Sequence, residues 1–183
     1  MNVVVHVCCA PCLAGTIDVF ATLGDVFAYF YNPNIHPLIE FRKRLKALEV
    51  FAEREKFEFQ AEREYGLFRF LSMVPPDGAG RCPLCYRERL GRTARLAAER
   101  GADAFTTTML CSTHQDHDAI RCAGEQAASE HGVEFIYRDL RDRARVGLDR
   151  AKKLSLYRQQ YCGCIFSEYE RYKDTNVEVR RAT

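Results

Sequence analysis

The stretch Val3-Val4-Val5-His6-Val7-Cys8-Cys9-Ala10-Pro11-Cys12 decides the fold of this chain. A valine-rich run of this kind is typical of a strand buried on both faces of a parallel sheet. Pro11 prevents the strand from continuing past the cysteines. In open α/β sheets, ligands bind beyond the carboxyl ends of the strands. The stretch therefore predicts three sulfur side chains at the edge of the sheet where a functional site is expected.

Strand and helix patterns alternate from residue 3 to residue 137. Strands are predicted over residues 3–7, 26–31, 57–61, 104–110 and 133–137. Helices are predicted over residues 14–23, 37–55, 65–73, 84–100 and 114–131. The alternation predicts an α/β fold of three layers, with a parallel sheet between helices. The periodicity places Arg42, Lys43, Arg44 and Lys46 on the outer face of the second helix, and it also places the arginines of residues 84–100 outward.

The length of 183 residues is typical of a single domain. We expect an α/β core over residues 1–140, a basic helical extension that bears cysteines over residues 141–170, and a frayed tail over residues 171–183. No stretch approaches the ~20 apolar residues of a membrane span, and the N-terminus lacks the basic start of a signal peptide. A cytoplasmic protein with no membrane partner is therefore predicted.

The net charge of +2 hides two basic stretches. Residues 138–158 hold eight Lys and Arg against three Asp, and residues 81–100 hold six Arg against two Glu. Such stretches suit a site for a polyanion. Solvated helix faces have the same composition, so charge alone leaves both interpretations open.

Seven of the nine cysteines fall into three groups: Cys8, Cys9 and Cys12; Cys82 and Cys85; Cys162 and Cys164. In a reducing compartment, clustered cysteines bind metal or do redox work, and thiolates are ligands of zinc and of iron–sulfur clusters. The successive side chains of Cys8 and Cys9 are expected to point apart, which suits a larger cluster better than a compact zinc site. Cys111 ends a predicted strand, whereas Cys122 and His6 are expected to be core residues.

Five motifs occur in one order along the chain: His6-Val7-Cys8-Cys9-Ala10-Pro11-Cys12, Phe30-Tyr31-Asn32-Pro33-Asn34-Ile35, Arg81-Cys82-Pro83-Leu84-Cys85-Tyr86, Phe105-Thr106-Thr107-Thr108-Met109-Leu110 and Tyr157-Arg158-Gln159-Gln160-Tyr161-Cys162-Gly163-Cys164. Together they resemble the cobalamin-independent epoxyqueuosine reductases of queuosine biosynthesis, over residues 3–168. The resemblance implies a HUP-type α/β fold, akin to that of PP-loop tRNA-modifying enzymes. It also implies an oxidoreductase that reduces the epoxide of epoxyqueuosine, at the wobble position of tRNA, to the alkene of queuosine.

The resemblance further implies a [4Fe-4S] cluster, a second metal such as iron in some members, and no cobalamin. The positions that match the family's cluster ligands are Cys8, Cys9, Cys82 and Cys85. Cys162 and Cys164 match its second redox pair, which is either a reversible disulfide or a set of ligands for the extra metal. Cys12 is assigned to the same catalytic centre. The segment Cys111-Ser112-Thr113-His114-Gln115 departs from the Ser-Pro turn that is usual in the family, so contacts there are left open.

The implied partners are tRNA that carries epoxyqueuosine and an electron donor that the sequence does not identify. The residues that suit contact with phosphates or splayed bases are Tyr31, Asn32, Arg81, Tyr86, Arg87, Arg158 and Tyr161. The reduction needs two electrons and two protons. A cluster that transfers one electron supplies only half of these electrons. A second centre, formed by the remaining cysteines, would supply the other electron. Candidate proton donors are His114, Asp116 and Tyr161.

Two other functions fit parts of the sequence. The segment Cys9-Ala10-Pro11-Cys12 after a strand is similar to the redox loop of thioredoxin-like folds, which favours a thiol–disulfide oxidoreductase. An RNA-binding module stabilised by zinc would use the same cysteines without catalysis. The two further cysteine pairs favour the iron–sulfur reductase over both.

Overall fold

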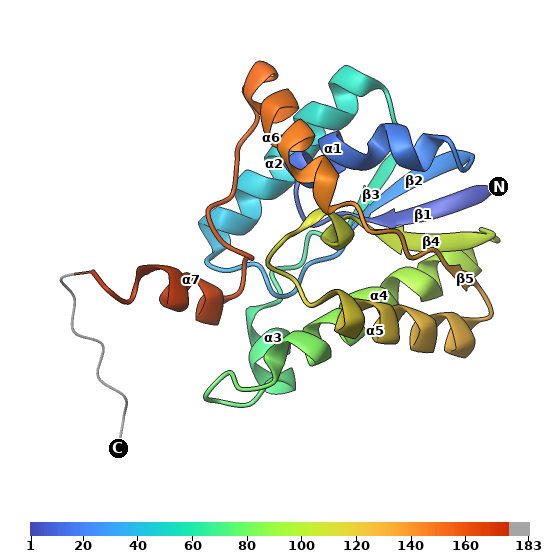
Figure 1. Ribbon diagram of the computed structural model, residues 1–183. Helices are drawn as coiled ribbons and strands as arrows, with labels where there is room; N and C mark the ends of the chain where they lie inside the picture. Colours follow the sequence, from blue (N-terminus) through green and yellow to red (C-terminus); the bar gives the residue numbers. More distant parts are fainter. Residues whose placement is uncertain (176–183) are drawn as a thin grey trace.

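The computed structural model describes residues 1–175, whose strands form one sheet (Figure 1). The strand order is β3-β2-β1-β4-β5, and every neighbouring pair is parallel. The strands are β1 (Asn2–His6), β2 (Asp25–Phe30), β3 (Phe59–Ala61), β4 (Ala104–Thr107) and β5 (Glu134–Phe135). The parallel sheet confirms the predicted α/β class.

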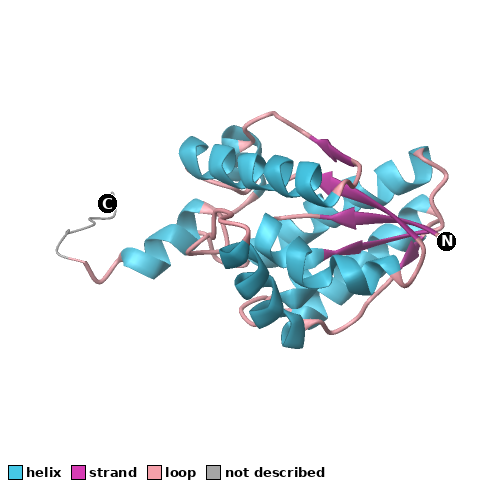
Figure 2. Ribbon diagram, turned by 90° about the horizontal axis from the view of Figure 1, so that it is seen from above, coloured by secondary structure: helices cyan, strands magenta, loops and turns pink. Residues whose placement is uncertain are grey.

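Helices cover both faces of this sheet (Figures 1 and 2). One layer holds α1 (Ala10–Ala21), α2 (Leu38–Glu55) and, packed on α1, α6 (Ala144–Lys153). The opposite layer holds α4 (Arg81–Glu99) and α5 (His117–His131), with α3 (Leu67–Met73) beside α4. The 3-10 turns are η1 (Thr108–Cys111) and η2 (Arg141–Arg143), and α7 (Ile165–Tyr172) projects from the body. The predicted three layers are confirmed.

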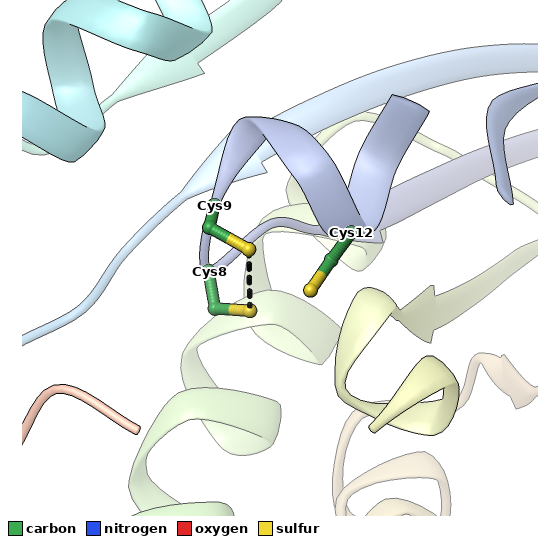
Figure 3. A group of neighbouring side chains, drawn as sticks. All are labelled: Cys8, Cys9 and Cys12. Atoms are coloured by element: carbon green, nitrogen blue, oxygen red, sulfur yellow. Dashed lines mark hydrogen bonds between the residues drawn. The ribbon is translucent and has the colours of Figure 1, made fainter. Parts of the chain in front are cut away.

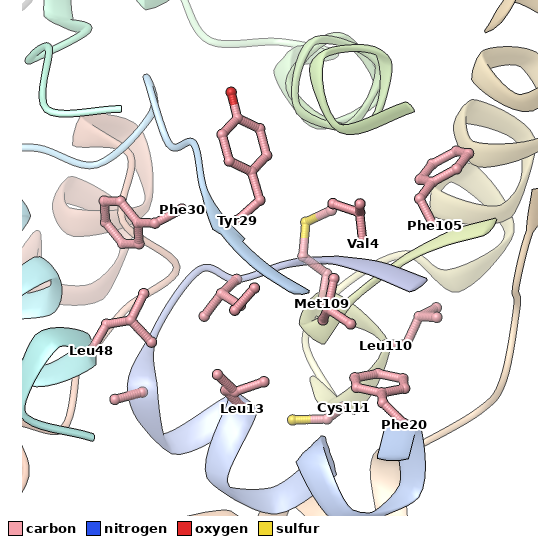
Figure 4. Packing of buried hydrophobic residues seen from close by; sticks show 14 of the residues in the cluster. Val4, Leu13, Phe20, Tyr29, Phe30, Leu48, Phe105, Met109, Leu110 and Cys111 are labelled. Carbon is pink, nitrogen blue, oxygen red and sulfur yellow. The ribbon is translucent and has the colours of Figure 1, made fainter. Parts of the chain in front are cut away.

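The central strand β1 carries the cysteine loop at its carboxyl end. Val3, Val4 and Val5 are at most 1% exposed and belong to the main core (Figure 4). The strand order reverses at β1, because β2 pairs on one side and β4 on the other. Ligands of doubly wound sheets bind beyond the carboxyl ends of the strands at such a reversal. Cys8 lies at this point.

The side chain of His6, at the end of β1, forms hydrogen bonds with the end of β4 and with the segment after β2. It is fully buried, with Nδ1 at 2.9 Å from Thr107 Oγ1 and Nε2 at 3.0 Å from the carbonyl oxygen of Tyr31. Because a carbonyl only accepts, Nε2 carries the proton and Nδ1 accepts from the Thr107 hydroxyl. Burial lowers the pKa of His6 to about 4, so the ring is neutral. The prediction of a core histidine is confirmed.

Two helices begin earlier than the sequence predicts. α1 begins at residue 10 instead of 14, and α4 begins at residue 81 instead of 84. Pro11 and Pro83 lie within the first turns, where a missing N–H costs nothing because those groups have no partner inside the helix. As a result, helical backbone and not a loop holds Cys12 and Cys82.

Strand β4 is shorter than predicted. Thr107 Oγ1 accepts a hydrogen bond from the Met109 nitrogen (3.1 Å), and this contact turns the chain into η1. Cys111 ends η1 inside the main core, 3% exposed (Figure 4). Cys122 is exposed, so the prediction of a core residue there is wrong. The buried stripe of α5 is Ile120, Ala123, Gly124 and Ala127. Cys122 lies off this stripe.

The chain after residue 140 packs α6 closely on α1. A Cβ atom on Gly147 would overlap the carbonyl oxygen of Pro11, and a Cβ atom on Gly15 would lie 3.0 Å from the Gly147 nitrogen. This approach therefore requires glycine on both helices. α7 ends at Tyr172, and the predicted tail over residues 171–183 lies outside the described residues from residue 176 onward. Within residues 1–175, no helix is long and apolar enough to cross a membrane.

The substitution Gly147→Ala should reduce the free energy of unfolding by roughly 1–3 kcal/mol, because the added methyl group forces α6 away from α1. Gly91→Ala is the matched control, since it adds a methyl group to α4 where nothing lies within 4 Å. That change should stabilise the protein by roughly 0.5–1 kcal/mol through helix propensity. Urea denaturation measures both. Equal or greater stability of Gly147→Ala would contradict the close packing of α1 and α6.

Candidate metal centre

A cavity of about 520 Å³ opens at the carboxyl edge of the sheet. The cysteines in its lining come from all three sequence groups: Cys8, Cys12, Cys82, Cys162 and Cys164. Met109 and Ser112, which follow β4, line it as well. The fold thus brings together sulfur side chains that are far apart in the sequence, at the place where the sheet topology predicts a ligand.

The first group forms the most compact cluster of sulfurs (Figure 3). The Sγ atoms of Cys8, Cys9 and Cys12 all lie within 4.8 Å of one another, and those of Cys8 and Cys9 are 3.8 Å apart. The expectation that Cys8 and Cys9 point apart is wrong, because the chain turns from an extended N-cap at Cys9 into α1. This compact group belongs to the N-terminal part of the chain, whereas the C-terminal extension adds Cys162 and Cys164 to the cavity wall.

A second group of sulfurs comes from α4 and the start of α7. Cys85 and Cys164 are buried and pack with Phe70 in a small separate core. Cys164 also caps α7, because its Sγ accepts a hydrogen bond from the Ser167 nitrogen (3.3 Å). The small core and the cap hold the extension over the cavity.

The cysteines differ in how readily they ionise. Burial raises the pKa of the Cys85 thiol to about 12, and burial also raises the pKa of Cys9. Side-chain hydrogen bonding with Cys12 and Cys9 lowers the pKa of Cys8. Metal binding requires thiolates and releases their protons. Cys8 is therefore the sulfur best prepared for a cation, and the buried thiols ionise only when a positive charge lies beside them.

Two buried arginines supply positive charge next to the sulfurs. Sequence periodicity places both on outer helix faces, but Arg44 is 1% exposed and Arg89 is 2% exposed, so this prediction is wrong. The guanidinium of Arg44 pairs with Glu40 (2.7 Å) and donates to the carbonyl oxygens of Tyr161 and Cys162 (2.9 Å each). These hydrogen bonds connect α2 to the C-terminal extension.

Arg89 has no comparable set of partners. Its Nε donates to the carbonyl oxygen of Cys85 (3.3 Å), while its Nη2 is buried without a hydrogen-bond partner among residues 1–175. No carboxylate of the described chain lies within ion-pair distance of it. Because a buried unpaired charge is costly, Arg89 indicates that the cavity holds an anionic group. Several thiolates around a metal satisfy this requirement, so the residues present fit a metal cofactor.

The proton donors proposed from the sequence occupy different places. His114 lines the cavity and is exposed. Tyr161 lines it too, with its hydroxyl donating to the carbonyl oxygen of His36. Asp116 lies outside the lining and caps α5 by accepting from the Ala119 nitrogen (3.0 Å). His114 is therefore the candidate at the cavity whose side chain has no hydrogen-bond partner among residues 1–175.

One polar residue of the site was missed at the sequence level. Gln159 lines the cavity, and its Nε2 lies 2.9 Å from the sulfur of Cys9. Gln159 belongs to the last of the five motifs, between Tyr157 and Cys164. Its place in that motif was the feature of the sequence from which a role at the site could have been predicted. The amide reaches the first cysteine group from the C-terminal extension and so joins the two ends of the chain at the site.

Three of the residues predicted to contact tRNA line the cavity: Arg81, Tyr86 and Tyr161. Asn32 is 2% exposed and donates to the carbonyl oxygen of Val7 (2.9 Å), so it supports the cysteine loop from within. Tyr31, Arg87 and Arg158 lie outside the lining. The contacts of these residues with RNA stay predictions.

Comparison with known proteins decides which family has this arrangement. A family model described as epoxyqueuosine reductase QueH matches residues 3–170. The chain belongs to this family. The predicted family and its oxidoreductase class are thereby confirmed, and membership of the QueH family favours the reductase over the two alternative functions.

Two QueH relatives cover nearly the whole chain. The epoxyqueuosine reductase QueH of Dehalococcoides mccartyi is 41% identical over 176 residues, which is 96% of this chain and 97% of the relative. That of Thermotoga maritima is 34% identical over 193 residues, 98% of this chain and 96% of the relative.

A solved structure with a similar fold is a tRNA-modifying enzyme. The U34-tRNA thiolase NcsA from Methanococcus maripaludis, with its [4Fe-4S] cluster, superposes with a TM-score of 0.58 at 13% identity. The match covers 91% of this chain and 61% of the thiolase chain. At this identity the likeness supports the predicted PP-loop-like fold and nothing further.

The unequal partners of the two buried arginines lead to opposite predictions for the metal-free protein. Arg89→Met should raise the free energy of unfolding by roughly 1–3 kcal/mol, because it removes an unpaired buried charge. Arg44→Met should lower it by roughly 3–5 kcal/mol, because it leaves Glu40 buried and unpaired. Chemical denaturation under reducing conditions measures both. Similar losses in the two variants would show that Arg89 already has an adequate partner without a bound anion.

Proposed function

We propose that the protein reduces the epoxide of epoxyqueuosine, at the wobble position of tRNA, to the alkene of queuosine. One observation carries the proposal. Cysteines from three distant segments line a single cavity at the carboxyl edge of the sheet, beside an arginine, Arg89, that has no anionic partner in the part of the chain that the structure describes. The names of the QueH relatives agree with this chemistry.

We further propose that Cys8, Cys9, Cys82 and Cys85 hold a [4Fe-4S] cluster. The support is their placement, because the cavity lining includes one member of each pair, while Cys9 and Cys85 lie buried just behind. Cys162, Cys164 and Cys12 form the second centre, as a dithiol or as ligands of a second iron. When bound, an iron–sulfur cluster supplies electrons singly, at a potential set by charge, hydrogen bonds and solvent exposure.

The residues of the chain provide the rest of the reaction. Conversion of an epoxide to an alkene consumes two electrons and two protons, breaks both C–O bonds and releases the oxygen as water. We assign the delivery of a proton to the imidazole of His114, whose side chain is exposed at the cavity. Arg81, Tyr86 and Tyr161 bind the substrate nucleotide, by charge and by stacking. The reaction uses no cobalamin, and an electron donor restores the centre after each turnover.

An anaerobic turnover assay tests the function. Protein reconstituted with iron and sulfide is mixed with tRNA that carries epoxyqueuosine and with a chemical reductant, and the nucleosides are analysed by mass spectrometry. Formation of queuosine in proportion to bound iron is the expected result. A brown protein that leaves the epoxide intact would contradict the proposed reaction, and a colourless protein with stoichiometric zinc would contradict the cofactor.

Single cysteine variants separate the two proposed centres. Cys82→Ser should lose most of the bound iron and all turnover, because serine is a poor ligand for iron in a sulfur cluster. Cys164→Ser should keep most of the iron and lose turnover. Cys122→Ser is the matched control, since Cys122 is exposed and lies outside the cavity lining. Iron analysis and the turnover assay report both quantities. Full activity in either of the first two variants would contradict the assignment.

A further inference from the structure

A second groove lies on the outer side of α2, apart from the cysteine cavity. It has a volume of about 370 Å³. Its lining combines apolar and basic residues of α2 with the start of the segment that follows α6: Ile39, Arg42, Lys43, Lys46, Ala47, Val50, Ser155, Leu156 and Tyr157. Nothing in the chemistry proposed for the cysteine cavity uses this groove.

Two of the cations at this groove lack acidic partners among the described residues. Arg42 and Lys43 are exposed, and neither forms an ion pair with any residue between 1 and 175. Lys46 has only an exposed contact with Glu49 at 3.6 Å. Exposed Lys152 and Lys153, at the end of α6, directly precede the groove segment. Four cations without an ion-pair partner in residues 1–175, Arg42, Lys43, Lys152 and Lys153, therefore lie at the groove or directly before its last segment.

The basic stretch singled out in the sequence behaves differently. Four of its arginines are neutralised by nearby carboxylates: Arg141 by Asp139, Arg143 by Asp18, Arg145 by Asp149 and Arg150 by Glu55. No residue of the stretch 138–158 is in the cavity lining. The cations of this stretch without a carboxylate partner in residues 1–175 are Arg138, Lys152, Lys153 and Arg158, and the last three lie at residues 152–158, beside or within the groove segment.

The groove and the cavity lie next to each other along one segment. Tyr157 lines the groove, and Gln159, two residues later, lines the cavity. Two residues span at most about 7 Å. Exposed Arg158 lies between them. A chain molecule with one residue in the cavity therefore has its neighbouring residues within reach of the groove.

We propose that this groove binds the phosphodiester backbone of the tRNA next to the wobble nucleotide, with Arg42 and Lys43 contacting phosphates. The inference rests on the proposed function, because it assumes that the wobble base enters the cysteine cavity. Free cations suit phosphates. The apolar floor and the ring of Tyr157, over which the Lys43 ammonium lies at 5.4 Å from the ring centroid, suit a sugar or an unstacked base. An acidic electron-donor protein is the competing occupant, and turnover measurements distinguish the two.

Binding measurements test the groove directly. The double variant Arg42→Gln/Lys43→Gln is compared with Arg95→Gln/Arg121→Gln, which removes the same charge from exposed positions on α4 and α5. Fluorescence anisotropy measures the affinity of each iron-loaded protein for full-length substrate tRNA between about 50 and 200 mM salt. The groove variant should bind about tenfold more weakly, and its slope of log Kd against log salt should fall by about 2. The control pair should match the unchanged protein, and Lys43→Arg should restore the affinity that Lys43→Gln loses.

Turnover distinguishes the two occupants. With a chemical reductant in place of a donor protein, the groove variant should show a raised KM for tRNA and an unchanged kcat. Unchanged tRNA affinity, with activity lost only when a protein donor is used, would overturn the RNA assignment in favour of a donor site. If the unchanged protein binds tRNA but reduces nothing, the proposed reaction fails, while loss of affinity in the groove variant would still support the groove.

Discussion

The parallel pairing of β1 with both β2 and β4 is the constraint on which the rest of the structure depends. It aligns the carboxyl ends of three strands at one edge, so the chain must deliver the cysteine loop, the polar turn after β2 and the turn η1 to the same place. The neutral His6 ring fixes that edge by bonding to Thr107 and to the backbone of Tyr31. α4 and the extension then add further sulfurs to the cavity, and Cys85 and Cys164 pack together in one small core.

Charge balance explains the features of the site that packing alone does not. Buried thiols resist ionisation, and a buried guanidinium without a carboxylate is unfavourable. The buried positive charge is compensated only if the neighbouring sulfurs become thiolates. A bound metal requires thiolates and so produces this negative charge. Arg44 satisfies its own charge with Glu40 and also ties the extension to α2, whereas Arg89 keeps an unpartnered Nη2 among the described residues. The centre is thus organised for an anion that residues 1–175 do not supply.

Local patterns predicted the sheet and the convergence of cysteines, because hydrophobic runs and strand ends are properties of short segments. They could not predict that Arg44 and Arg89 are buried, since helical periodicity places charged residues outward and the sulfurs that attract them come from elsewhere in the chain. Cys122 failed as a core residue for a related reason, because the inward stripe of α5 depends on its packing against α4. The starts of α1 and α4 were predicted too late because proline usually ends a helix, although it is tolerated in the first turn.

Diffraction from anaerobically grown crystals of the iron-loaded protein, collected at the iron absorption edge, tests the central claim most directly. The account predicts strong anomalous density in the cavity, bonded to sulfurs of both the Cys8 and Cys82 groups and close to the Arg89 guanidinium. Density confined to the compact group Cys8, Cys9 and Cys12, with Cys82 and Cys85 left as free thiols, would contradict it.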